Sequence, residues 1–119
     1  MRGLLIKPPW IDLILSGQKT WELRGTNTKK RGEIALILSG SGLIVGSCEL
    51  ANVIGPLSLK EINENFSKHQ VPLEAIKSIM AYKKTYAWVL ENSNPLKVSV
   101  PYKHPRGAVI WVKLPFTHL

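Results

Sequence analysis

Apolar and polar positions follow two different periods near the start of the chain, and they predict a strand, a helix and a second strand. Gly3–Lys7, which contains the apolar run Leu4–Ile6, is predicted to be a buried strand. Trp10–Ser16 is apolar at five of its seven positions, which predicts a short helix buried on more than one side. Pro9 suits the first position of this helix, and Gly17 suits the residue that ends it.

The second strand, Thr20–Arg24, has the most informative pattern in the chain. At a period of two, Thr20, Glu22 and Arg24 fall on one face, and the apolar residues between them fall on the other. Lys19 stands at the entry to this strand. An ammonium, a carboxylate and a guanidinium group this close together could bind a polar ligand or transfer a proton. An amphipathic strand with a solvated polar face fits the same spacing.

Similar signals predict the elements of the rest of the chain. Gly25–Gly32 has no apolar residue and is expected to be a surface loop. A capping-box pattern predicts a helix from Ser58 to about His69, and a second helix is expected from Pro72 to Met80. Further strands are predicted at Glu33–Leu38, Leu43–Val53, Tyr86–Leu90, Leu96–Val100 and Ala108–Leu114.

Glycines and prolines mark the connections between these strands. Gly40-Ser41-Gly42 is typical of a hairpin, Asn94-Pro95 of a turn, and Gly46 of a bulge within its strand. Pro101–Gly107 is expected to be a basic loop. Six or seven strands with short inserted helices predict an α+β fold built on a small closed or nearly closed β-barrel. All 119 residues, 1–119, are expected to form a single domain.

The composition limits the compartment and the class of protein. No apolar run approaches 18 residues, so we expect no membrane-spanning segment. Cys48 is the only cysteine, which leaves no internal disulfide and indicates a reducing compartment. The cytoplasm is therefore the expected location. The small and apolar neighbours of Cys48 predict a buried thiol.

The charge favours polyanionic partners over metals and nucleotide cofactors. Sixteen Lys and Arg residues against eight Asp and Glu residues give a formal net charge of +8. Nucleic acid is the most frequent partner of a small basic domain. Asp12 is the only aspartate, the histidines have no metal-ligand spacing, and neither a P-loop nor a Gly-x-Gly-x-x-Gly pattern is present. We therefore expect no metal and no cofactor.

Several short motifs along the chain form a recognisable combination. They are Lys7-Pro8-Pro9-Trp10, Gly17-x-Lys19-x-x-Glu22-x-Arg24, the basic loop that ends in Arg31-Gly32, and Gly107-x-x-x-Trp111. With these motifs the chain resembles the ASCH domain, the activating-signal-cointegrator homology family, over essentially its whole length. The resemblance implies a PUA-like β-barrel with a cleft beside the first helix. It also implies that the domain binds RNA or a nucleotide-like ligand.

The resemblance assigns the site residues one by one. Three polar residues of the Gly17–Arg24 segment become the cleft residues. Lys7 and Trp10, near the start of the first helix, stand at the rim of the cleft, and an arginine closes its loop side. The ligand-binding residues implied in this way are Lys7, Trp10, Lys19, Glu22, Arg24 and Arg31.

Two functions are compatible with these residues. In the first, Arg24 and Lys19 hold a phosphate or an oxygen of RNA, and Glu22 accepts hydrogen bonds from a base amine or a ribose hydroxyl. The alternative is a small hydrolase, because some branches of the family resemble amidohydrolases that act on N4-acetylcytidine, or ribonucleases. Lys19 and Glu22 would then be the catalytic acid/base pair, with a lysine of lowered pKa as proton acceptor.

Other features of the sequence bear on this choice. The amidohydrolase branch has a threonine nucleophile three positions after the motif lysine, where this chain has Glu22, and the nearest threonine is Thr20. This departure weakens the amidohydrolase interpretation. Trp10 either stacks on a base or packs in the core. A protein-interaction module is a third possibility, which only the small size of the domain supports.

Overall fold

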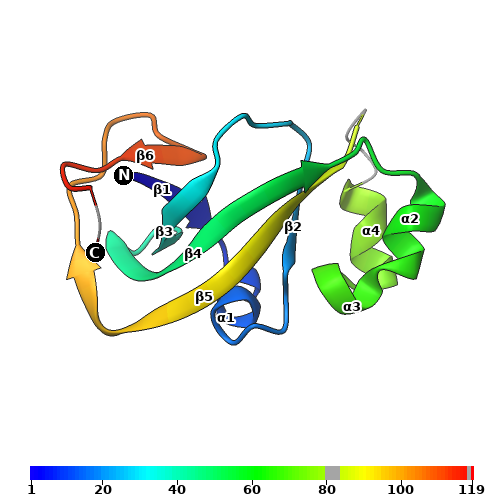
Figure 1. The fold of residues 1–119 in the computed structure, drawn as a ribbon, viewed down its shortest axis with the longest axis horizontal. Helices are drawn as coiled ribbons and strands as arrows, with labels where there is room; N and C mark the ends of the chain where they lie inside the picture. The colour runs from blue at the N-terminus through cyan, green and yellow to red at the C-terminus, as the bar shows by residue number, and fades with distance from the viewer. Residues whose placement is uncertain (80–83, 118) are drawn as a thin grey trace.

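The computed structural model describes residues 1–79, 84–117 and 119, which form six strands and four short helices (Figure 1). The strands are β1 (Arg2–Ile6), β2 (Trp21–Arg24), β3 (Gly32–Leu38), β4 (Leu43–Ile54), β5 (Tyr86–Pro101) and β6 (Trp111–Lys113). The helices are α1 (Trp10–Leu15), α2 (Leu59–Glu64), α3 (Phe66–His69) and α4 (Leu73–Ile79). In the described ranges, no helix has the length and apolar character needed to cross a membrane.

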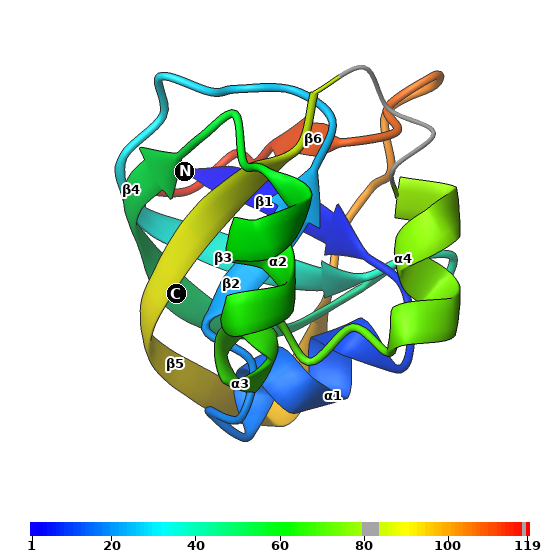
Figure 2. The ribbon, with the colours of Figure 1, turned by 90° about the vertical axis from the view of Figure 1, so that its right-hand side faces the viewer.

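All six strands belong to one sheet, in the order β2-β5-β4-β3-β1-β6. Strand β1 runs parallel to β3, and every other neighbouring pair is antiparallel. The sheet curls into a half-barrel whose two edges are β2 and β6 (Figure 2). The predicted α+β fold on a small barrel is confirmed, with a half-barrel in place of a closed ring.

Apolar side chains of the strands and of α1 fill the inside of the half-barrel. Leu4, Leu36 and Trp88 of the strands are almost fully buried, and Ile11 and Ile14 of α1 pack against them. Full burial of a leucine or isoleucine side chain contributes about 1.5–3 kcal/mol. This cluster therefore fixes α1 against the sheet, which positions the chain that follows it.

A second apolar cluster joins β2 to α2 and α4. Trp21 and Leu23 of β2 pack together with Ile62 of α2, with Ile76 of α4 and with Val71 in the segment before α4. Helices α2, α3 and α4 lie together at one end of the molecule, beside β2 (Figure 1). The predicted apolar face of the second strand is confirmed, and its burial leaves the opposite face for polar residues.

Strand β5 differs most from the prediction. Tyr86–Pro101 is one continuous strand, so the turn predicted at Asn94-Pro95 and the separate strand predicted at Leu96–Val100 are wrong. Strand β2 pairs only with the first four residues of β5. Beyond them, among the described strands, one side of β5 has no neighbour, which gives the strand a free edge of the kind where proline is tolerated.

The helix predicted over Ser58–His69 begins as expected and breaks at Asn65. The Ser58 hydroxyl accepts a hydrogen bond from the Glu61 amide, and the Glu61 carboxylate accepts one from the Ser58 amide, which confirms the capping box. The Asn65 side chain donates to the Glu61 carbonyl at 2.7 Å while its backbone leaves the helical region. The predicted end of the next helix, Met80, lies outside the described residues.

Three smaller expectations concern a bulge, the last strand and the cysteine. Strand β4 shifts its register against β5 between Ile44 and Gly46, which confirms the bulge predicted at this glycine. The strand predicted at Ala108–Leu114 is shorter, because only Trp111–Lys113 pairs with β1. Cys48 is buried, and burial raises the pKa of its thiol to about 12.

Candidate functional site

A cleft of about 440 Å³ lies between the end of β1, α1, β2 and α4. Its volume is within the range of about 300–1,000 Å³ that is usual for small-molecule sites. Five of the six predicted ligand-binding residues line it. The full lining consists of Leu5, Lys7, Trp10, Lys19, Glu22, Leu23, Arg24, Ser39, Val71, Ala75, Ser78 and Val109.

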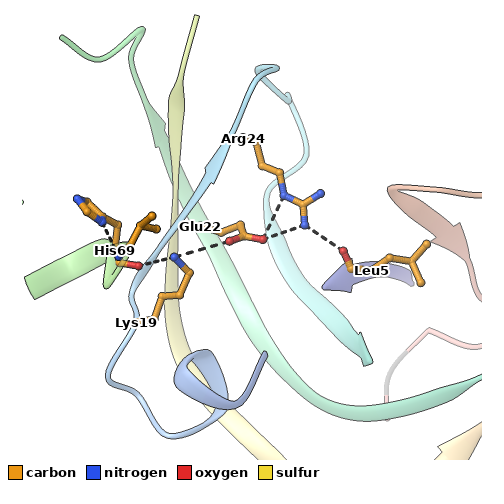
Figure 3. A network of polar contacts seen from close by, with 6 residues as sticks. Leu5, Lys19, Glu22, Arg24 and His69 are labelled. Atoms are coloured by element: carbon orange, nitrogen blue, oxygen red, sulfur yellow. Dashed lines mark hydrogen bonds and ion pairs between the residues drawn. The ribbon is translucent and has the colours of Figure 1, made fainter. Parts of the chain in front are cut away.

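Strand β2 carries Glu22 and Arg24 into this cleft (Figure 3). Arg24 donates from Nε at 3.2 Å and from Nη2 at 2.9 Å to the same carboxylate oxygen of Glu22. Nη2 also donates to the carbonyl oxygen of Leu5 at 2.9 Å, which connects β2 to β1. The guanidinium lies over the ring of Trp88, 5.6 Å from its centroid. No residue in the described part of the chain accepts a hydrogen bond from Nη1 of Arg24, so this group is free to bind a ligand.

Lys19 lies at the floor of the cleft with only 1% of its surface exposed. Its ammonium donates to the carbonyl oxygen of His69 at 2.5 Å and lies 3.7 Å from Oε1 of Glu22 (Figure 3). Burial lowers the pKa of Lys19 to about 8; the Glu22 carboxylate raises it in part, and the charge on Arg24 lowers it further. Because an ammonium has three donors, one N–H remains for a ligand.

His69 is a supporting residue of the site that the sequence analysis missed. Its Nε2 donates to the Ile62 carbonyl at 2.6 Å, and its Nδ1 accepts from the Val71 amide at 2.9 Å, which defines a neutral ring. Burial lowers the pKa of His69, and the charge on Lys19 adds to this effect. His69 and Lys19 are 50 positions apart, and no local pattern in the sequence connects them.

The rim of the cleft contains both residues expected there. Lys7 is exposed directly after β1, and Trp10 is half-buried at the start of α1. The Trp10 ring packs against both apolar clusters, and the ammonium of Lys19 lies 5.2 Å from its centroid. Trp10 therefore both packs in the core and lines the cleft. Ser39 and Ser78 add two hydroxyl groups that the sequence did not point to.

Two polar residues considered for the site lie elsewhere. The exposed Arg31 donates from Nη1 to the carbonyl oxygens of Thr28 at 2.9 Å and Lys30 at 2.7 Å, and it does not line the cleft. Thr20 lines a different cavity, beside Lys68, so the prediction that it shares a surface with Glu22 is wrong. The alternation fails at Thr20 because β2 begins only at the next residue.

Comparison with known protein families identifies the fold and the family together. A model of the ASCH domain matches residues 4–101 of the chain. This chain belongs to the ASCH domain family. The crystal structure of ASCH from Zymomonas mobilis has a similar fold, with a TM-score of 0.66 and 16% sequence identity. The similarity covers 79% of this chain and 68% of that one.

Two variants of the Zymomonas mobilis protein have the same fold. The variant with a tyrosine replaced by phenylalanine gives a TM-score of 0.67 at 16% identity, over 84% of this chain and 74% of that one. The variant with a serine replaced by alanine gives a TM-score of 0.71 at 14% sequence identity, over 95% of this chain and 87% of that one. No curated protein matches the chain. At these identities the likeness shows the fold alone.

The cleft of this ASCH domain combines three cationic side chains with one carboxylate. Arg24 and Lys19 retain free donors for an anion, and Oε1 of Glu22, 3.7 Å from Lys19, retains the capacity to accept a hydrogen bond. The amine of Lys19 can also gain or lose a proton near neutral pH, because its pKa is about 8. In the described ranges, no three His, Cys, Asp or Glu side chains are grouped so that they could hold a metal ion.

Proposed function

We propose that this ASCH domain binds RNA or a nucleotide-like ligand in the cleft beside α1. Membership of the ASCH family supports an RNA-binding function in general. The formal net charge of +8 favours a polyanionic ligand. The observation that carries the proposal is the convergence of cations, a carboxylate and an indole ring on one cavity: Lys7, Lys19, Arg24, Glu22 and Trp10.

Each polar group has a role that follows from its free hydrogen-bonding capacity. Nη1 of Arg24 and the remaining N–H of Lys19 bind a phosphate or carbonyl oxygen. Both are charged donors for which the described residues provide no acceptor. Oε1 of Glu22 accepts from an exocyclic amine or a ribose hydroxyl. Lys7 contacts a phosphate at the rim, and the exposed part of Trp10 packs against the base.

A hydrolase acting on N4-acetylcytidine or on RNA is the second candidate. The observation in its favour is the burial of Lys19, which lowers its pKa to about 8 beside the Glu22 carboxylate and suits an acid/base pair. Thr20, the one threonine close to the motif, lies in another cavity. The residues that α4 and the segment before it contribute to the cleft, Val71, Ala75 and Ser78, include no carboxylate. We therefore rank binding above hydrolysis.

Binding is tested with a labelled single-stranded RNA of about ten nucleotides and with cytidine 5′-monophosphate as competitor. Lys7→Ala removes an exposed cation from the rim of the cleft and is expected to weaken RNA binding about threefold to tenfold. Lys113→Ala is the matched control, since Lys113 is exposed on β6 and lines no part of the cleft. Equal losses in the two variants, or no binding of either probe, would contradict the proposal.

Turnover is tested in the same preparation with N4-acetylcytidine and with the RNA. Release of acetate or of RNA fragments that Lys19→Met abolishes would make hydrolysis the function of the cleft. Binding without turnover, weakened in Lys7→Ala and retained in Lys113→Ala, supports the proposal as stated.

A further inference from the structure

A second cavity of about 490 Å³ adjoins the cleft and shares one wall with it. Four residues line both: Leu5, Lys7, Ser39 and Val109. The second cavity continues past this wall to the loop that follows β5. Its remaining lining consists of Gly40, Gly42, Tyr102, His104 and Ala108.

We propose that the two cavities form one groove that binds two consecutive nucleotides of single-stranded RNA. The first base enters the cleft, Lys7 contacts the phosphate that joins the two nucleotides, and the second base stacks on the ring of Tyr102. This inference rests on the proposed function, and it deepens that function by naming an RNA strand, as opposed to a free nucleoside, as the ligand.

The position of Lys7 supports this order of contacts. Lys7 is exposed and lies in the wall common to both cavities, where a chain passing from one to the other must place its backbone. Phosphates are the charged part of that backbone, and they are the part that lysine contacts most readily. Among the described residues, none that lines the second cavity is acidic, whereas the exposed Lys103 and Arg106 lie in the same loop as Tyr102.

Tyr102 is held in place before any ligand binds. Its hydroxyl lies 2.8 Å from Nδ1 of His104, and Nε2 of His104 lies 3.0 Å from the carbonyl oxygen of Ala108. Because the carbonyl can only accept, a neutral His104 donates from Nε2 and accepts the tyrosine proton at Nδ1. The half-buried ring of Tyr102 lines the cavity, and burial raises the pKa of its hydroxyl. A fixed aromatic ring of this kind is a suitable stacking surface for a base.

The test compares two ligands that differ by the second nucleoside, whose attachment also converts the 3′-phosphate from a monoester to a diester. Cytidine 3′,5′-bisphosphate supplies one base and both phosphates, and the 5′-phosphorylated dinucleotide pCpC adds the second cytidine. The dinucleotide is expected to bind about tenfold more tightly. Tyr102→Ala should remove this advantage while the affinity for the bisphosphate stays the same, which also shows that the variant folds. Tyr102→Phe keeps the ring and should retain the advantage.

The other outcomes separate this inference from the proposed function. If the bisphosphate binds and pCpC binds no more tightly, the two-nucleotide groove is wrong and the cleft proposal stands. If Tyr102→Ala weakens both ligands equally, Tyr102 does not stack on the second base, and the inference is wrong. If neither ligand binds, both the inference and the proposed function are overturned.

Discussion

At the scale of single residues, the site depends on how two cations share one buried carboxylate. Glu22 is 7% exposed, and one of its carboxylate oxygens accepts two hydrogen bonds from Arg24. The ammonium of Lys19 lies 3.7 Å from the other carboxylate oxygen. The Glu22 carboxylate is therefore too weak a partner to offset the burial of Lys19, whose pKa falls to about 8. The charge of Lys19 therefore changes close to physiological pH.

The pH dependence of binding follows from Lys19. Its protonated form is the one proposed to bind phosphate, and this form is lost as the pH rises through about 8. We expect the affinity for single-stranded RNA to be nearly constant below about pH 7 and to fall by up to tenfold per pH unit between about pH 8 and 9.5. Isothermal titration calorimetry at several pH values measures this affinity. Lys19→Arg remains charged and should remove the dependence; an unchanged pH profile in this variant would contradict the role of Lys19.

The stability of the site depends on Arg24. Arg24→Ala leaves the Glu22 carboxylate buried with only Lys19 nearby, and we expect the free energy of unfolding to fall by about 3 kcal/mol in urea denaturation. Adding Glu22→Gln should recover part of this loss, because a neutral amide needs no cation. Lys60→Ala is the control: it breaks an exposed ion pair with Glu64 and should cost less than about 0.5 kcal/mol. If Arg24→Ala lowers the free energy of unfolding no more than this control does, the Glu22–Arg24 pair does not stabilise the folded protein.

The sequence predicted the part of the site that depends on local geometry. Glu22 and Arg24 share a face because a strand repeats every two residues, and this held within β2. The prediction for Thr20 was wrong because this residue lies outside that strand, where the period no longer applies. Arg31, which the family resemblance assigned to the loop side of the site, donates to carbonyl oxygens of its own loop and does not line the cleft. The contact of Lys19 with the His69 carbonyl joins residues 50 positions apart, and such a contact can be seen only in the folded chain.

At the scale of elements, the bulge in β4 lets α1 pack closely against the sheet. Gly46 lies beside Leu15 at the end of α1, and a Cβ at this position would lie 2.8 Å from the carbonyl oxygen of Asn94 in β5. The glycine therefore lets the helix and two strands approach closely. Patterns in the sequence located these elements well, since period and capping residues are local. They failed for β5, because β2 pairs only with the first residues of this strand. Whether a proline further along β5 lies at a free edge depends on the order of the strands in the sheet, which no local pattern shows.

Gly46→Ala tests this close approach. A side chain at Gly46 must displace backbone as well as the Leu15 side chain, and we expect a loss of about 1–3 kcal/mol in the free energy of unfolding, measured by urea denaturation. Gly40→Ala is a suitable control, because an added Cβ meets nothing there and only the positive φ of 83° is strained. That control should lose about 1–2 kcal/mol. A Gly46→Ala variant as stable as the unmodified protein would show that α1 and β5 are less closely packed than described.

At the scale of the whole molecule, the excess of positive charge should govern affinity for RNA. Three cations, Lys7, Lys19 and Arg24, lie in the cleft within a domain of net charge +8. Each phosphate neutralised on a single strand contributes about 0.7 to the slope of log affinity against log salt concentration. Salt dependence therefore reports how many phosphates the domain contacts.

We expect a slope of about −1.4 for single-stranded RNA, measured by fluorescence anisotropy between about 50 and 200 mM salt. This value corresponds to two phosphate contacts, one at Arg24 and Lys19 and one at Lys7. Lys7→Ala should reduce the steepness by about 0.7, and Lys113→Ala should leave it unchanged. A slope close to zero would mean that RNA, if bound, is held without its phosphates.

The most direct test of the cleft is a crystal structure of the protein with cytidine 5′-monophosphate. The account predicts a phosphate oxygen within about 3 Å of Nη1 of Arg24 or Nζ of Lys19, with the base against Trp10. A nucleotide bound instead in the cavity beside Thr20 and Lys68, or on any surface away from Lys19, Glu22 and Arg24, would contradict it.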